Sequence, residues 1–165
     1  MSCKVKELIL NGIIYNTSIE ADRRIIGKYY ELKLLSYFNN NNIEVEYISN
    51  DNIFSSYDFI ITYNNIKYIV ELKSRLNDIN NHNFELISSN KIKAFKKLIN
   101  KNKDVIKILF VFNHIITEDN FKFYYYIVNT NEIENIAFLN YDCYDKPTYE
   151  LPMKYIKPLE QLLKI

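Results

Sequence analysis

Two carboxylates and an ammonium interrupt a segment that otherwise reads as buried strand. The segment is SYDFIITYNNIKYIVELKSR, and the interrupting side chains are Asp58, Glu71 and Lys73. Hard divalent cations such as Mg²⁺ take oxygen ligands, and carboxylates are common among them. The residue types therefore suit a divalent-cation site, on the condition that the fold brings the two carboxylates together.

The surrounding residues predict a hairpin that meets this condition. Residues 59–63 and 66–72 are rich in β-branched and aromatic side chains. Asn64-Asn65 between them tolerate positive φ, which predicts a two-residue turn. Tyr63 then faces Ile66, and continuing the same register along both strands places Asp58 opposite Glu71.

Directly opposed side chains of this kind repel each other. Their Cβ atoms lie roughly 4.5–5.5 Å apart, and like charges at that separation are destabilising. A divalent cation between Asp58 and Glu71 would remove the repulsion, and Glu71→Gln is expected to leave the metal-free fold at least as stable. The alternative is a surface hairpin in which Glu71 and Lys73 form a solvated pair. The charges cluster at one end of strands that are apolar on both faces, which favours the site.

Hydrophobic periodicity predicts an α/β fold with a mixed sheet flanked by helices. The expected order is α-β-β-β-α-β-β, and the tail is expected to be irregular because of Pro147, Pro152 and Pro158. A polar loop is expected at Asn77 to Asn83. The expected elements are a helix opened by a capping box of Thr17 and Glu20 and ending near Phe38, a strand at 43–48, the hairpin, a helix capped by Ser89, strands at 105–112 and 121–128, and a last helix at 159–165.

The charged residues and the order of elements together resemble the PD-(D/E)XK signature of the restriction-endonuclease-like nuclease superfamily. Asp58 matches the first acidic position, Glu71-Leu72-Lys73 matches E-x-K, and the αβββαβ core corresponds to about residues 17–113. Tyr57 stands at the position of the motif's proline. The pattern GKYYELKLL, YDFII and VELKSR most closely resembles archaeal-type Holliday junction resolvases.

This resemblance implies a metal-dependent DNA endonuclease of the junction-resolving, site-specific or repair type. Asp58 and Glu71, with Glu31 directly or through water, would hold one or two Mg²⁺ ions, for which Mn²⁺ can substitute, together with the backbone carbonyl of Leu72. Lys73 would orient or deprotonate the attacking water and offset developing negative charge. The resemblance also implies a homodimer. The alternative function is a noncatalytic nucleic-acid-binding or protein-interaction domain, against which the intact charged set argues.

Glu31 matches the further acidic residue on the family's first helix. On a helical wheel, Gly27, Glu31, Leu35 and Phe38 lie on one track, which places Glu31 among apolar neighbours and one turn after a glycine that leaves room for an approaching group. The ordinary alternative is a surface ion pair with Lys28 or Lys33, but neither lies four residues away. No geometry recommends Glu46 or Asp51 as substitutes.

A basic stretch follows the hairpin. Between residues 88 and 107 the only acid is Asp104, and the lysines are Lys91, Lys93, Lys96, Lys97, Lys101, Lys103 and Lys107. Such a stretch suits phosphate neutralisation. We expect Lys91, Lys93, Lys96, Lys97 and Arg75 to contact DNA, with Lys91 near the reacting phosphate. The alternative is the solvated face of an amphipathic helix.

Other polar and aromatic residues carry less information. Tyr124 to Tyr126 could stack on bases, although a packed strand explains them too. We expect His82 in a loop and His114 at a strand end, and neither stands in a zinc or HNH pattern. Cys3 and Cys143 have no metal-ligand spacing, which favours a reducing, intracellular setting in cytoplasm or nucleus.

The composition indicates one domain. The chain has 165 residues with 48% hydrophobic content and a net charge of +1. We expect a single domain at 1–165, with a core at about 17–128 and a C-terminal extension at 129–165. No apolar run is long enough for a membrane span, and the N-terminus does not read as a signal peptide. Abundant Lys, Asn, Ile and Tyr indicate an AT-rich genome, such as that of a virus or parasite.

Overall fold

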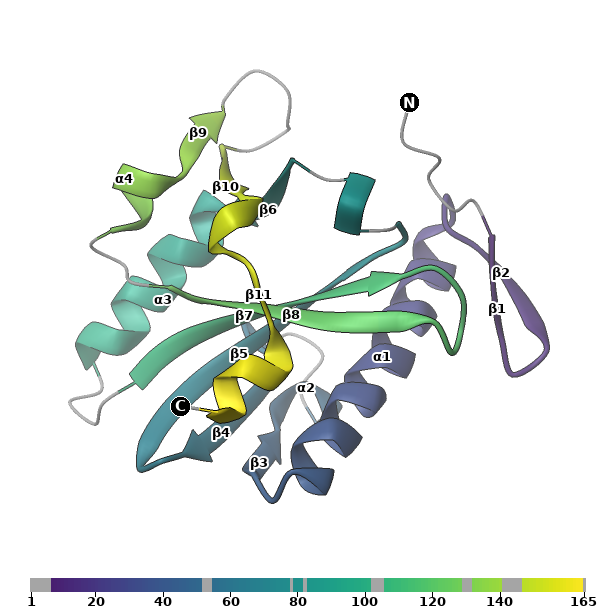
Figure 1. The fold of residues 1–165 in the computed structure, drawn as a ribbon, viewed down its shortest axis with the longest axis horizontal. Helices are drawn as coiled ribbons and strands as arrows, with labels where there is room; N and C mark the ends of the chain where they lie inside the picture. The colour runs from purple at the N-terminus through teal and green to yellow at the C-terminus, as the bar shows by residue number, and fades with distance from the viewer. Residues whose placement is uncertain are drawn as a thin grey trace.

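A six-stranded mixed sheet lies at the centre of the molecule, and helices cover both of its faces (Figure 1). The computed structural model describes residues 7–51, 55–77, 79–81, 83–101, 106–128, 132–140 and 147–164. Their elements are, in order, β1 (Glu7–Leu10), β2 (Ile13–Asn16), α1 (Glu20–Asn40), β3 (Glu44–Tyr47), α2 (Ile48–Asp51), β4 (Phe59–Tyr63), β5 (Ile66–Arg75), the 3₁₀ helix η1 (Ile79–Asn81), β6 (Phe84–Ser88), α3 (Ser89–Lys101), β7 (Ile106–Ile115), β8 (Phe121–Val128), α4 (Ile133–Ile136), β9 (Phe138–Asn140), β10 (Thr148–Pro152), η2 (Met153–Tyr155), β11 (Lys157–Pro158) and η3 (Leu159–Lys164).

The order of strands in the central sheet is β11-β8-β7-β5-β4-β3. β5 and β7 are parallel, and every other neighbouring pair of this sheet is antiparallel. A parallel pair needs a crossover connection, and α3 supplies it. The expected mixed sheet flanked by helices is therefore confirmed, with α1-β3-β4-β5-α3-β7 as its core.

The hairpin of β4 and β5 has the predicted turn and register. Asn64 and Asn65 have φ values of 50° and 61°, as a two-residue hairpin turn of this kind requires. Tyr63 pairs with Ile66, and Phe59 pairs with Val70. The predicted register is confirmed for residues 59–63 and 66–70, and Asp58 and Glu71 follow directly at the open end of the hairpin.

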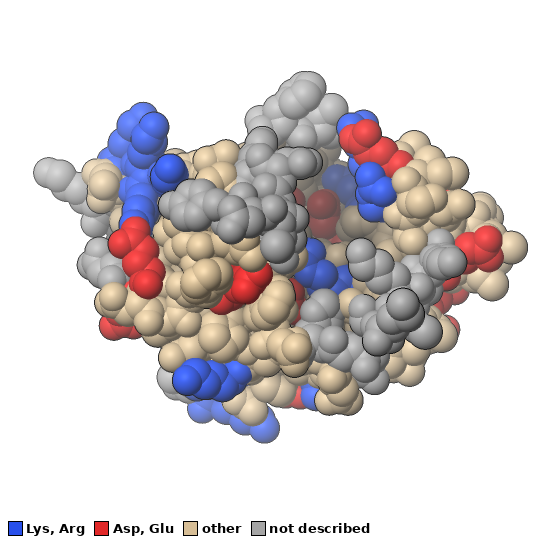
Figure 2. Space-filling model, turned by 90° about the horizontal axis from the view of Figure 1, so that it is seen from above, with Lys and Arg blue, Asp and Glu red and all other residues tan. Residues whose placement is uncertain are grey.

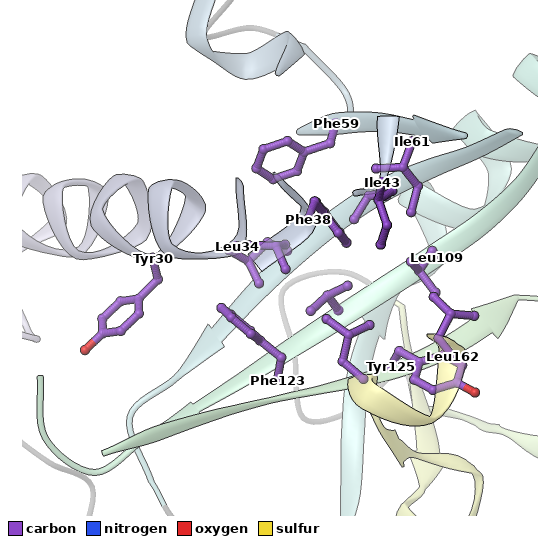
Figure 3. Packing of buried hydrophobic residues seen from close by; sticks show 14 of the residues in the cluster. Tyr30, Leu34, Phe38, Ile43, Phe59, Ile61, Leu109, Phe123, Tyr125 and Leu162 are labelled. Carbon is purple, nitrogen blue, oxygen red and sulfur yellow. The ribbon is translucent and has the colours of Figure 1, made fainter. Parts of the chain in front are cut away.

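Each face of the sheet has its own hydrophobic cluster, because successive side chains of a strand point to opposite faces. On one face, a row of α1 side chains packs against β4, β5 and β8 (Figure 3). This row consists of Ile26, Tyr30, Leu34 and Phe38, all fully or almost fully buried. On the other face, Ile92 and Phe95 of α3 pack against Ile69 and Phe110. Glu71 and Lys73 alternate with the first face's apolar residues and so belong to the α3 side.

The predicted helix caps are wrong. The N-cap residue of α1 is Ile19, which makes no side-chain cap hydrogen bond, and the helix begins at Glu20. The chain before it is held instead by Asn16, whose Oδ1 accepts the Ser18 N–H at 2.9 Å and whose N–H donates to Asp22 at 2.7 Å. At α3, the hydroxyl of Ser89 is buried and has no hydrogen-bond partner among the described residues. Asn16 and Asp22 therefore hold the chain just before α1, and Ile19 rather than Thr17 is the N-cap residue of the helix.

Several short strands were not predicted. β1 and β2 form a hairpin whose Asn11-Gly12 turn has φ values of 50° and 79°, a strong hairpin signal. β6 covers part of the segment after the expected polar loop and pairs with β10 in a second sheet, β6-β10-β9. The tail is therefore not irregular, since Tyr149 and Leu151 alternate as buried residues of β10. The expected last helix is a 3₁₀ helix, η3.

None of the helices in the described ranges is both long and apolar enough to cross a membrane.

Candidate active site

Asp58 is the last residue before β4, and the backbone fixes it on several sides. Its N–H donates to the Val70 carbonyl at 2.9 Å, and its own carbonyl accepts the N–H groups of Ile48 and Ser49 at 2.9 and 3.2 Å. Its carboxylate Oδ2 accepts the Leu72 N–H at 2.8 Å. The start of α2 and the end of β5 therefore position this side chain together.

Glu71 is buried, with 4% of the residue exposed, and two ammonium groups converge on one of its oxygens. Lys73 Nζ lies 2.6 Å from Glu71 Oε1, and Lys91 Nζ lies 3.1 Å from the same atom. The expected neighbourhood of Glu71 and Lys73 is present. Lys91 comes from the first turn of α3, so the crossover helix delivers a cation to the end of the hairpin.

The electrostatics of Asp58 differ from those of Glu71. Burial and the charge of Glu71 raise the pKa of Asp58 to about 7, although the Leu72 N–H and Lys73 act in the opposite direction. Among the described residues no Lys or Arg forms an ion pair with Asp58. Two carboxylates held this close, one with a strongly raised pKa, are typical of functional sites rather than of surface hairpins.

Glu31 lies at the edge of the apolar face of α1 and reaches toward β3 and α2. Its Oε2 accepts the Tyr47 hydroxyl at 2.6 Å and the Ser49 hydroxyl at 2.9 Å. Lys28 Nζ lies 3.5 Å from the same oxygen and 4.5 Å from the centre of the Tyr47 ring. Our expectation that Glu31 has no lysine partner on its helix is wrong, because a spacing of three residues also brings side chains together.

Ser49 connects Glu31 to Asp58, and reasoning from the sequence missed it. Its N–H donates to the Asp58 carbonyl, while its hydroxyl donates to Glu31. Tyr47 was also missed, although it pairs with Phe59 in the sheet and stacks on that ring with centroids 4.8 Å apart. Extending the predicted register from β4 to β3 would have placed Tyr47 opposite Phe59.

The donor set fits a magnesium ion held by few protein ligands. Mg²⁺ commonly binds one or two carboxylates and keeps several waters. Asp58 and Glu71 can provide these carboxylates, with the Leu72 carbonyl nearby in the chain. Within the described ranges no three His, Cys, Asp or Glu side chains are grouped closely enough to hold a metal. Glu31 therefore stands apart from the pair, and a role for it through water stays a prediction.

The predicted DNA-contacting lysines divide into different groups. Lys93, Lys97 and Lys101 form an exposed row along α3, and Lys107 is exposed on β7. Lys96 Nζ instead lies 3.5 Å from Glu134 Oε1 of α4. The lysines therefore do not form one continuous basic surface. Lys93, Lys97 and Lys101 form an outward row, whereas Lys91 points into the site. Lys103 lies outside the described residues.

Arg75 belongs to a separate buried cluster. Its Nε donates to Glu85 Oε2 at 3.1 Å, and its Nη2 donates to the Leu86 carbonyl at 3.1 Å. His114 Nε2 lies 2.5 Å from Glu85 Oε1, and Glu85 is fully buried. Burial alone raises the pKa of Glu85, but the hydrogen bond with His114 and the charge of Arg75 together bring it below its ordinary value. A DNA contact by Arg75 stays a prediction.

The remaining candidates are less central. Tyr125 and Tyr126 are buried, which agrees with the packed-strand explanation for them. Tyr124 lies edge-on to His114, with ring centroids 5.6 Å apart. Glu46 is exposed on β3. Cys3, His82, Asp104, Cys143 and the side chain of Asp51 lie outside the described residues.

Comparison with known proteins confirms the fold. No protein-family model and no curated protein sequence matches the chain. Among solved structures it is similar to Hjc, a Holliday junction resolvase from the archaeal hyperthermophile Archaeoglobus fulgidus, with a TM-score of 0.53 and 9% identity over 84% of this chain and 95% of that chain. It is also similar to a nuclease from a fusselovirus, with a TM-score of 0.47 and 18% identity over 92% and 93% of the two chains. The likeness to the resolvase shows the restriction-endonuclease-like fold that the motif predicted.

Proposed function

We propose that this protein is a metal-dependent DNA endonuclease. One observation carries the proposal: Asp58 and Glu71 meet at the end of the hairpin, and the pKa of Asp58 is raised to about 7 by burial and by Glu71. The fold likeness to Hjc supports it, because Hjc is a Holliday junction resolvase. Mg²⁺ is the proposed ion, with Mn²⁺ as a substitute.

The roles of the side chains follow from their positions. A bound divalent cation would polarise a phosphoryl oxygen and lower the pKa of a bound water. Asp58 and Glu71 would hold it as ionised carboxylates. Lys73, whose ammonium lies 2.6 Å from Glu71, is placed to orient the attacking water and to offset negative charge on the phosphate. Glu31, through Ser49, positions the carbonyl side of Asp58.

Substrate binding is proposed along α3. Its exposed lysines, Lys93, Lys97 and Lys101, are spaced by one helical turn and can follow a phosphate backbone. Figure 2 shows basic and acidic side chains together inside a hollow near the middle of one face of the molecule. Duplex or branched DNA is the proposed substrate, and a four-way junction is one candidate because Hjc is a Holliday junction resolvase. A homodimer, a single domain over 1–165 and an intracellular location complete the proposal.

Cleavage assays on a panel of substrates test this function. Supercoiled plasmid, a four-way junction, a hairpin, single-stranded DNA and duplex RNA would each be incubated with Mg²⁺, with Mn²⁺ and with a chelator. We expect metal-dependent cutting of at least one DNA substrate by the wild type and none by Asp58→Asn. Binding without cleavage under all metal conditions would instead favour a noncatalytic nucleic-acid-binding domain.

A further inference from the structure

The ammonium of Lys91 occupies a bridging position inside the site. Besides its 3.1 Å contact with Glu71 Oε1, Lys91 Nζ donates a hydrogen bond to the Ser56 carbonyl at 2.5 Å. The ring of Phe95 lies beneath it, with its centre 5.8 Å from Nζ. Only 25% of the Lys91 side chain is exposed, and holding the long chain in this position costs rotamer entropy that these contacts must offset. Its position is therefore a specific one.

This bridge joins three segments that must cooperate in the proposed reaction. Ser56 precedes Asp58 by two residues, Glu71 lies on β5, and Lys91 lies in the first turn of α3. Both ammoniums of the site approach the same oxygen of Glu71, whereas Asp58 has no cationic partner among the described residues. The Lys91 ammonium of α3 thus supplies part of the positive charge beside Glu71 when no metal is bound.

We propose that Lys91 is an internal counter-ion that competes with the divalent cation for Glu71 and leaves that carboxylate when the cation binds. This inference rests on the proposed function, and it adds regulation to the same site. The freed ammonium would then lie beside the exposed row of Lys93 and Lys97, where a substrate phosphate can accept it. Metal binding and DNA binding would in this way favour each other.

Lys91, rather than Lys73, is the cation that leaves. Lys73 follows Glu71 by two residues on the same strand and face, so the backbone keeps it close whatever else binds. Lys91 reaches Glu71 from another element, and its contact with Oε1 is longer, 3.1 Å against 2.6 Å. The flexible four-carbon side chain of Lys91 can also swing outward from the first turn of α3 without a change in the helix.

The direct test is a calorimetric titration of the full chain with Mn²⁺ in the absence of DNA. Lys91→Met keeps the approximate length of the side chain and removes its charge. Lys93→Met removes the same charge from the exposed side of the same helix and serves as the matched control. Because a nearby positive charge disfavours cation binding, we expect Lys91→Met to bind Mn²⁺ about tenfold more tightly or better, while the control stays within about twofold of wild type.

Lys91→Gln provides a second variant, since its amide can still donate a hydrogen bond without carrying charge. It should show the same tightening, which assigns the effect to charge rather than to the hydrogen bond with Ser56. An unchanged or weaker Mn²⁺ affinity in both Lys91 variants overturns the inference, and if the wild type still cuts DNA the proposed function stands. Absence of Mn²⁺ binding in every protein, together with absence of cleavage, overturns both.

Discussion

Two buried clusters in this protein combine carboxylates with basic side chains, and their electrostatics are opposite. In the Glu85 cluster, Arg75 and His114 both contact the one carboxylate, and its pKa ends below the ordinary value in spite of burial. In the Asp58–Glu71 pair, both lysines contact Glu71, and the pKa of Asp58 rises to about 7.

This difference supports our proposal that the first cluster is structural and the second is the active site. Every charged group of the first cluster has a partner, and the cluster joins β6 of the small sheet to β5 and β7 of the central sheet. The second retains a repulsive pair that a cation from outside the chain can relieve. Buried charge alone therefore does not indicate a site, whereas a buried carboxylate with a raised pKa and no ion-pair partner among the described residues does.

Removing the charge of Glu85 should have the largest effect on stability. Glu85→Gln leaves Arg75 and His114 without their carboxylate, and breaking a buried ion pair in this way costs about 3–5 kcal/mol. Denaturant unfolding would measure it, with Glu134→Gln as the control because that residue's pair with Lys96 is exposed and worth less than about 1 kcal/mol. Equal effects from the two variants would remove the distinction between buried and surface pairs.

The stability that Glu85 contributes should depend on pH in a specific direction. A carboxyl with a lowered folded pKa stabilises the fold above its unfolded pKa, and this stability is lost as the pH falls through the folded value. The difference in unfolding free energy between wild type and Glu85→Gln should therefore be constant near neutral pH and shrink below about pH 4.5. A difference that grows toward acid pH would contradict the assignment.

Asp58→Asn should stabilise the metal-free protein, which is the opposite of the effect expected for Glu85→Gln. The amide oxygen can still accept the Leu72 N–H, while the repulsion with Glu71 disappears, so we expect the metal-free protein to gain about 1–2 kcal/mol at neutral pH. Because the folded pKa of Asp58 is raised, wild-type stability should also decline as the pH rises toward about 7, and the variant should lack this decline. A clear loss of stability in Asp58→Asn would show a structural carboxylate instead.

Gly27→Ala should also stabilise the protein, by a smaller amount. Gly27 lies inside α1, and a Cβ there would meet no described atom within 4 Å. Glycine in a helix interior is less favourable than alanine by about 1 kcal/mol, which the substitution should recover in thermal unfolding. Gly12→Ala is the matched control and should destabilise, because φ at Gly12 is +79°. Should Gly27→Ala destabilise as well, the helix is packed more tightly at that point than the described residues show.

Neutralising Lys93, Lys96 and Lys97 should have the least effect on the fold. Their substitution by Gln should change the unfolding free energy by less than about 0.5 kcal/mol, as for ordinary surface positions. DNA binding should weaken, and the slope of log affinity against log salt should fall by about one for each phosphate that the protein no longer neutralises. An unchanged slope would identify these three lysines as part of a solvated helix face.

Local pattern was sufficient for the part of the molecule that depends on neighbouring residues. The Asn64-Asn65 turn fixes the register of the hairpin, and the register brings Asp58 and Glu71 to the same end of it. Contacts between segments far apart in the sequence could not be predicted from local pattern. Lys91 reaches Glu71 only because α3 crosses over to β7, and Glu85 meets Arg75 only because β6 joins a second sheet.

The sequence also led us to expect that Glu71→Gln leaves the metal-free fold at least as stable. That expectation shows the same limit of reasoning from local pattern. The hairpin by itself shows two repelling carboxylates and does not say which of them the rest of the fold neutralises. The structure shows Lys73 and Lys91 both on Glu71, so Asp58 is the carboxylate whose charge the fold tolerates least. The capping-box prediction for α1 was wrong because the helix begins at Glu20, after Ile19, and the side chains of Asn16 and Asp22 hold the chain before it.

Thermal unfolding with and without Mg²⁺ tests most directly whether the Asp58–Glu71 pair is a metal site. At a concentration about 100-fold above Kd, binding to the folded state alone stabilises by about 2.7 kcal/mol. Above pH 7, we predict this gain for wild type and for Glu85→Gln, and none for Asp58→Asn. A wild type that Mg²⁺ does not stabilise, or an Asp58→Asn variant stabilised equally, would contradict the account.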